Sequence, residues 1–161
     1  MIASRQLIYI SPEEYLELEE KSPIKHEYID GEIYAMAGAS DRHITIALNI
    51  ASELRHHLKS SGCGVYISDM KLQIKKLNRF YYPDVMVTSN QDDKPTENYK
   101  RFPSIIIEIL SPSTEDFDRG DKFSDYQQIP TLQEYVLIST KKNQVDIFKR
   151  HEKGLWILQS Y

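Results

Sequence analysis

Cysteine is nearly absent from this sequence, since Cys63 stands alone among 161 residues. A single cysteine excludes an internal disulfide and a multi-cysteine zinc site. Long apolar runs are also missing, because no stretch approaches the roughly 20 residues that a bilayer-spanning helix needs. The first residues, Met1 to Gln6, lack the basic region and apolar core of a signal peptide. These absences predict a cytoplasmic protein that makes no use of a membrane.

Positive charge is not in excess either. The 20 lysines and arginines stand against 24 aspartates and glutamates, so the formal net charge is −4. This balance argues against a non-specific nucleic-acid coat protein, because such proteins gain their affinity by neutralising phosphates. It does not exclude a nuclease, whose active site concentrates carboxylates and recovers charge by binding divalent cations.

Repeats, low-complexity segments and linkers rich in Pro, Gly or Ser are absent as well. The length fits one domain comfortably and two only with difficulty. Residues 1–161 are therefore expected to form a single domain.

Two helices and a hairpin are predicted in the first 60 residues. Ser11 is a suitable N-cap for a short helix from Pro12 to Glu20. The hairpin is indicated by Asp-Gly between β-forming residues in the range 25–36. After a break at residues 38–41, apolar side chains recur with the 3.6-residue period of a core-facing helix that continues to about residue 59.

The rest of the chain predicts strands and one further helix. Residues 105–110 are apolar on both faces, as in a central strand that is covered on both sides. The other expected elements are strands at Met70–Ile74 and Tyr81–Thr88, a surface loop at Ser89–Pro103, a helix from about Asp118 to Gln128, and strands at Tyr135–Ser139, Val145–Arg150 and Trp156–Leu158. This order predicts an α/β domain with a mixed sheet flanked by helices.

Two acidic residues stand in predicted strands that should be buried. Glu108 lies within a run of Ile and Leu residues, where a carboxylate is costly unless a cation or strong donors compensate. Asp84 lies in a similar strand, directly after Pro83. One such acid is commonly satisfied by an arginine or by backbone amides, but two in adjacent strands are harder to explain in this way. The pair therefore predicts a divalent-metal site.

The sequence resembles the PD-(D/E)XK nuclease superfamily, and within it a bacterial branch of restriction-endonuclease-like proteins. Pro83-Asp84 and Glu108 match the superfamily motif, which alone is a weak signal. A specific, ordered set of further matches runs from about residue 11 to residue 139. These matches are Glu27–Glu32, Ala37–Ser40, His43, Tyr82–Val87, Ile107–Thr114, Asp118–Lys122 and Tyr126.

The resemblance implies a restriction-endonuclease-like fold and a function. Nucleic acid, with DNA the expected substrate, would be hydrolysed to leave 5′-phosphate ends. Asp84 and Glu108 would hold one Mg²⁺, for which Mn²⁺ can substitute, and leave positions for water and phosphate.

One residue departs from the superfamily pattern. The lysine expected two residues after Glu108 is replaced by Leu110, which cannot orient water or stabilise charge on a phosphate. In the branch resembled here, the following helix supplies the lysine, and Lys122 is the matching residue. Asp118 and Tyr126 lie one helical turn to either side of it. A lone lysine on such a helix is usually solvated, but the matching spacing favours a catalytic role for Lys122.

Further residues are candidates for supporting roles. His43 opens the long helix, where the resembled family also has a histidine that faces the site, although a histidine bonded to the backbone is an equal alternative. Glu27 and Glu32 lie on one face of the hairpin and would add a carboxylate or a second metal. Asp69 begins a neighbouring strand and would reach the edge of the site, and Tyr126 would support it from the helix.

Three alternatives to a nuclease remain open at this point. The first is a catalytically inactive nuclease fold that binds nucleic acid or a protein. The absence of a lysine at Leu110 favours this alternative, and the presence of Asp84, Glu108 and Lys122 argues against it. A small-molecule metalloenzyme would show a closed pocket in place of an open groove edged by the basic residues at positions 71–79. A purely structural dimer module would use Asp84 for stability alone.

A homodimer is also expected. Cutting both strands of a duplex needs two active sites, and small members of the superfamily that the sequence resembles commonly pair. Tyr-rich strands and an acidic overall charge are compatible with a self-complementary interface of C₂ symmetry.

Overall fold

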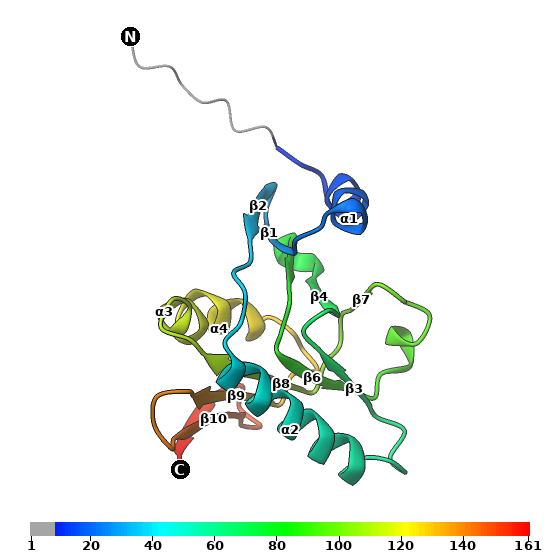
Figure 1. Ribbon diagram of the computed structural model, residues 1–161. Helices are drawn as coiled ribbons and strands as arrows, with labels where there is room; N and C mark the ends of the chain where they lie inside the picture. Colours follow the sequence, from blue (N-terminus) through cyan, green and yellow to red (C-terminus); the bar gives the residue numbers. More distant parts are fainter. Residues whose placement is uncertain (1–8) are drawn as a thin grey trace.

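The computed structural model describes residues 9–161 and divides their strands between two mixed sheets (Figure 1). The five-stranded sheet has the order β2 (Glu32–Ala35), β1 (His26–Ile29), β5 (Arg79–Tyr81), β4 (Lys71–Ile74) and β7 (Tyr99–Lys100). The six-stranded sheet has the order β11 (Trp156–Ser160), β10 (Val145–Arg150), β9 (Glu134–Ser139), β8 (Ile105–Leu110), β6 (Val85–Thr88) and β3 (Gly64–Ile67). One parallel pair occurs in each sheet, β4 with β7 and β8 with β9.

The helices complete an α/β fold, as predicted. They are α1 (Pro12–Lys21), α2 (Asp41–His57), α3 (Glu115–Arg119) and α4 (Asp121–Tyr126), with short 3₁₀ turns η1 (Lys75–Leu77) and η2 (Gln91–Asp93). No helix within residues 9–161 has the length and apolar character needed to cross a bilayer. The segment in which no signal peptide was recognised, residues 1–6, lies outside the described residues.

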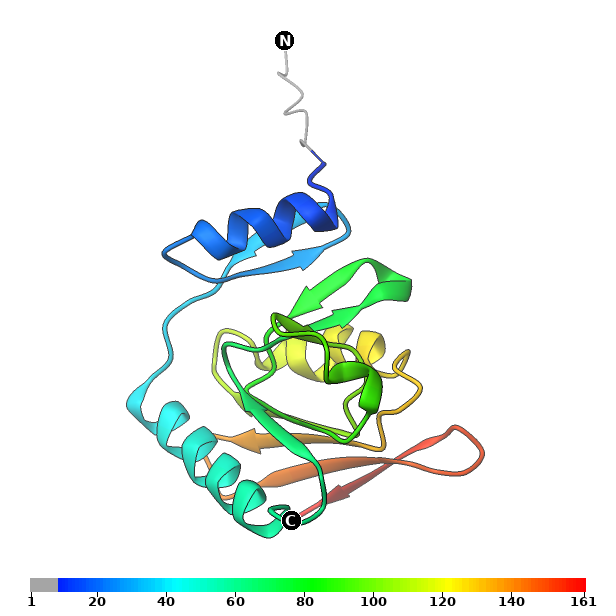
Figure 2. The same ribbon diagram turned by 90° about the vertical axis from the view of Figure 1, so that its right-hand side faces the viewer.

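Three hydrophobic clusters hold these elements in layers (Figure 2). α1 packs on the outer face of the five-stranded sheet, where the Tyr15 ring stacks on Tyr28. α4 lies between the sheets, because Tyr126 contacts Tyr81 of one sheet and Tyr135 of the other. α2 covers the outer face of the six-stranded sheet through its buried alanines. The two sheets are thus joined through α4.

Local sequence signals predicted the first elements correctly. The Ser11 side chain accepts a hydrogen bond from the backbone of Glu14 and caps α1. Ile29 pairs with Glu32 across the two-residue turn of the β1–β2 hairpin. Asp30 has a positive φ of 45°, which this kind of turn requires and aspartate tolerates.

The single strand predicted at Tyr81–Thr88 is wrong. The chain forms β5, leaves the five-stranded sheet at residues 82–84, and enters the six-stranded sheet as β6. Pro83 has no N–H to donate to a ladder, so a break at this point costs no hydrogen bond. Asp84 therefore stands at the point where the chain passes from one sheet to the other.

Two further predictions need correction. The helix expected from Asp118 to Gln128 is divided at Gly120, so that α3 begins earlier and α4 ends at Tyr126. The surface loop expected at Ser89–Pro103 contains η2 and β7. The strand β3 (Gly64–Ile67), which follows the long helix, was not predicted.

Candidate active site

Asp84, directly before β6, lies opposite Glu108 of the neighbouring strand β8. β6 and β8 are antiparallel and pair Val85 with Ile107, so the next position in this register sets Asp84 against Glu108. The backbone N–H of Asp84 donates to Glu108 Oε2 at 3.2 Å. In return, the N–H of Ile109 donates to Asp84 Oδ2 at 2.8 Å. Each carboxylate is therefore held by a backbone N–H of the segment opposite it.

Glu108 is the more deeply buried of the two acids. Burial raises the pKa of its carboxyl to about 8; the Lys122 ammonium opposes this rise, and the nearby charge of Asp84 adds to it. Its Oε1 accepts a hydrogen bond of 2.9 Å from Tyr126 Oη. Tyr126 is itself buried in the core between the two sheets. The carboxyl group is consequently fixed in position and is poorly solvated.

Lys122 lies among three carboxylates. Its Nζ is 3.0 Å from Glu108 Oε1, 3.2 Å from Glu27 Oε1 and 3.5 Å from Asp118 Oδ1. Only 7% of its side chain is exposed. Burial alone would lower the pKa of Lys122, but the three carboxylates outweigh this effect and hold the pKa well above its usual value. Lys122 is therefore a fixed cation beside Glu108.

An aromatic ring supports Lys122 from the five-stranded sheet. The ammonium lies 5.5 Å from the centre of the Tyr81 ring, a favourable cation–π arrangement. Tyr81 Oη donates to Asp125 Oδ2 at 2.5 Å, and Asp125 also pairs with Arg79. The strand position at which the superfamily has its lysine holds Leu110, which is buried in the central cluster. Lys122 thus places an ammonium next to Glu108 from a different element.

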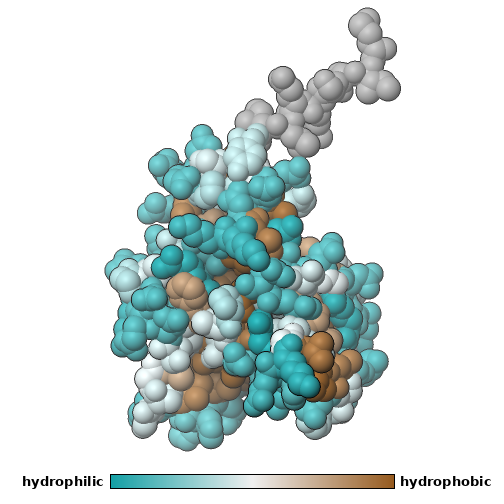
Figure 3. Space-filling view, turned by 180° about the vertical axis from the view of Figure 1, so that it is seen from behind, coloured by the Kyte–Doolittle hydropathy of each residue, from teal (hydrophilic) through white to brown (hydrophobic). Residues whose placement is uncertain are grey.

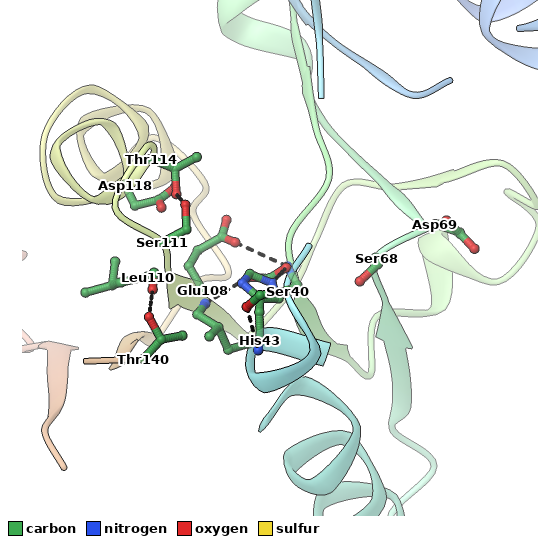
Figure 4. A network of polar contacts seen from close by, with 12 residues as sticks. Ser40, His43, Ser68, Asp69, Glu108, Leu110, Ser111, Thr114, Asp118 and Thr140 are labelled. Atoms are coloured by element: carbon green, nitrogen blue, oxygen red, sulfur yellow. Dashed lines mark hydrogen bonds and ion pairs between the residues drawn. The ribbon is translucent and has the colours of Figure 1, made fainter. Parts of the chain in front are cut away.

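His43 approaches Asp84 from α2. Its Nε2 lies 2.8 Å from Asp84 Oδ1, and its backbone N–H donates to the N-cap Ser40 Oγ at 3.3 Å (Figure 4). The pKa of His43 is raised because it hydrogen-bonds to Asp84, although its burial opposes this shift. The histidine therefore bonds to the acid as well as to the helix cap.

The structure does not bring Glu32 and Asp69 into this group. Glu32 is exposed on β2 and accepts a hydrogen bond from Tyr34 Oη. Asp69 is 88% exposed and pairs with Lys25 at 2.6 Å, away from Glu108 (Figure 4). The hairpin instead contributes Glu27, which the sequence placed on the same face as Glu32.

Asp118 and Tyr81 were not among the predicted site residues. The sequence signals for Asp118 were its spacing of four residues from Lys122 and its place in the matching segment Asp118–Lys122, whereas Tyr81 gave none. Burial raises the pKa of Asp118, while Lys122 opposes the shift. Asp118 thus adds a third carboxylate to those that surround the ammonium.

Asp84 and Glu108 are the residues suited to hold a cation. Among residues 9–161, no three His, Cys, Asp or Glu side chains form a ready-made ligand set. Carboxylate oxygens suit a hard divalent cation, and Mg²⁺ commonly binds one or two carboxylates while water and phosphate complete its shell. Burial raises the pKa of Glu108 because it disfavours the ionised carboxylate, and such a cation would offset that cost. The donor set therefore fits a divalent cation shared with substrate.

A separate cavity of about 680 Å³ lies at the carboxyl end of α2. Its walls include Arg55 and Tyr66, but none of Asp84, Glu108 and Lys122. The acidic pair and the ammonium accordingly belong to a different part of the surface.

Comparison with known proteins gives consistent matches. A family model described as "Uma2: Putative restriction endonuclease" matches residues 12–161. A protein of Synechocystis sp., "Uncharacterized protein slr1290", is 40% identical over 94% of this chain and 80% of its own length. A second, "Uncharacterized protein sll1609", is 37% identical over 90% of this chain and 83% of its own length.

A solved structure has the same fold. The crystal structure of a putative nuclease belonging to DUF820 from Anabaena variabilis superposes with a TM-score of 0.75. The match covers 94% of this chain and 84% of the other, with 19% sequence identity. The similarity therefore extends over most of both chains.

Proposed function

This chain belongs to the Uma2 family of putative restriction endonucleases, within the restriction-endonuclease-like superfamily, and we propose that it is a divalent-metal-dependent nuclease. One observation carries the proposal: the opposed carboxylates of Asp84 and Glu108, with the Lys122 ammonium 3.0 Å from Glu108. A carboxylate pair beside a fixed cation is the arrangement that phosphodiester hydrolysis needs, because the reaction requires an activated water and stabilisation of charge on phosphate.

The residues of the site have distinct roles in this proposal. Asp84 and Glu108 would hold Mg²⁺ or Mn²⁺, which when bound polarises phosphate and lowers the pKa of water. The Lys122 ammonium would stabilise negative charge on the phosphate in the transition state. His43 keeps Asp84 oriented through its 2.8 Å contact, and Tyr126 keeps Glu108 oriented through its hydroxyl.

DNA is the proposed substrate, since the family is described as putative restriction endonucleases, which cut DNA. A second candidate is an inactive fold that binds nucleic acid without cutting it. Leu110 favours this candidate, because the strand itself supplies no ammonium. The 3.0 Å contact between Lys122 and Glu108 favours the enzyme.

A cleavage assay tests the proposal. Labelled DNA and RNA, duplex and single-stranded, are incubated with the protein in Mg²⁺, in Mn²⁺ and in EDTA. We expect cleavage of DNA that leaves 5′-phosphate ends with either metal and none in EDTA. Binding without cleavage under every condition would favour the inactive fold, and neither binding nor cleavage would overturn both candidates.

We also propose a homodimer, in which a second copy covers apolar side chains that one copy exposes. Ile44 and Leu48 lie one turn apart on α2 and are exposed, as are Ile157 and Leu158 on the edge strand β11. Seen from behind, apolar areas are separated by hydrophilic ones (Figure 3). Sedimentation should give twice the chain mass at roughly tens of micromolar, where interfaces of standard size form; a strict monomer would contradict this proposal.

A further inference from the structure

The turn between β9 and β10 lies at the same edge of the sheet as the end of the strand that carries Glu108. β8 and β9 are parallel, so both end at this edge. Thr140 Oγ1 donates a 2.8 Å hydrogen bond to the carbonyl of Leu110, two residues beyond Glu108. Figure 4 shows Thr140 and Leu110 joined in this way beside Glu108. The turn therefore has a fixed place next to the candidate active site.

This turn presents two lysines to solvent. The backbone N–H groups of Lys141 and Lys142 both donate to Ser139 Oγ, at 3.2 and 3.3 Å, which stabilises the turn. The Lys141 side chain is 61% exposed, and its Nζ is 3.7 Å from Glu115, a loose ion pair. Lys142 is exposed and makes no ion pair with any residue in the range 9–161. Both ammonium groups are accessible to an anionic ligand.

The cations at the centre of the site are already engaged. The ammonium of Lys122 contacts the carboxylates of Glu27, Glu108 and Asp118, and His43 contacts Asp84. A divalent cation would be held by Asp84 and Glu108, so none of these charges is free for the phosphates on either side of the scissile one. Nucleic-acid strands are held chiefly by neutralisation of their phosphates. A strand at this site therefore needs cations from its rim.

We propose that Lys141 and Lys142 bind the phosphates that flank the scissile phosphate, so that the strand passes over the β9–β10 turn. The inference rests on the proposed nuclease function and adds to it the path of the nucleic acid. It also identifies the ligand class, a phosphodiester backbone contacted independently of its sequence.

The test compares two lysine pairs. K141Q/K142Q removes the pair at the site, and K149Q/K153Q removes an equal charge at the other end of β10, near the turn to β11. Lys149 and Lys153 are exposed, and Lys149 makes a surface ion pair of 3.4 Å with Glu134. Binding of a fluorescent DNA duplex is measured by anisotropy in EDTA, over a range of salt concentrations. Melting temperatures confirm that both variants fold.

The expected result is a change in salt dependence for one variant alone. Loss of two phosphate contacts should reduce the slope of log K against log salt by about 1.8, since each contact contributes about 0.9. K149Q/K153Q should keep the slope of the unmodified protein. Equal slopes for K141Q/K142Q and the unmodified protein, or equal losses in both variants, would overturn the inference and leave the nuclease proposal intact. If the unmodified protein binds no duplex in this assay, the inference falls, whereas the nuclease proposal is decided separately by the cleavage assay with Mg²⁺ and Mn²⁺.

Discussion

Asp84→Asn and Glu108→Gln should each reduce metal-dependent cleavage by about two orders of magnitude or more, the usual effect of losing a positioned catalytic group. Both substitutions preserve shape and remove charge, and a neutral amide is a poor partner for a hard divalent cation. Asn at position 84 still has an oxygen to accept the N–H of Ile109. We therefore expect binding of Mn²⁺, measured by calorimetry, to weaken in both variants, and the melting temperature of Asp84→Asn to change little.

Two matched controls are available in the same chain. Asp69→Asn and Glu32→Gln make the same chemical changes at exposed acids that the structure places outside the site. Both controls should cleave within about twofold of the unmodified protein, because exposed substitutions away from structural features usually have small effects. Full cleavage by Asp84→Asn or Glu108→Gln would move the metal site elsewhere.

Lys122→Met should abolish cleavage while the two carboxylates still bind metal. The loss of a positioned ammonium that stabilises transition-state charge typically costs about two to three orders of magnitude in rate. The substitution also leaves Glu27, Glu108 and Asp118 buried without their shared cation. Breaking a buried ion pair in this way costs about 3–5 kcal/mol, so the variant would also unfold at a lower temperature.

Lys122→Arg separates the two effects. Arginine keeps the charge and so most of the stability, but its planar group does not reproduce the compact ammonium beside Glu108. We expect a melting temperature near that of the unmodified protein and cleavage that is still reduced by at least about tenfold. Calorimetry with Mn²⁺ should show that metal binding persists. Full activity of Lys122→Arg and Lys122→Met would assign the role to another residue, with Lys71 the next candidate.

The sequence predicted the elements that depend on near neighbours. A cap such as Ser11 and a turn such as Asp30-Gly31 are determined by residues within one turn of each other, and both were predicted correctly. The division of the strands between two sheets depends on contacts far apart in the chain, such as the packing of Phe80 against Tyr15 and Tyr28. No local pattern carries this information, so one sheet was expected.

In the candidate site, too, some residues were recognisable from their neighbours in the sequence, and others only from contacts between distant parts of the chain. Asp84 and Glu108 were recognisable because acids in apolar strands are costly without compensation. The choice between Glu27 and Glu32 was not predictable, since both lie on one face of the hairpin and only its docking against α4 selects Glu27. The contact of Lys122 with the Tyr81 ring likewise follows from the docking of α4.

The contact between Glu27 and Lys122 has a consequence for when the candidate site can form. Glu27 belongs to the first hairpin and Lys122 to the last helix, α4, which packs between the two sheets. Proteins begin to fold from the N-terminus during synthesis. A nascent chain on the ribosome has the hairpin long before it has α4, so the ammonium cannot join its carboxylates until most of the polypeptide has emerged. A nuclease with this arrangement could not cleave the nucleic acids around the ribosome until translation is nearly complete.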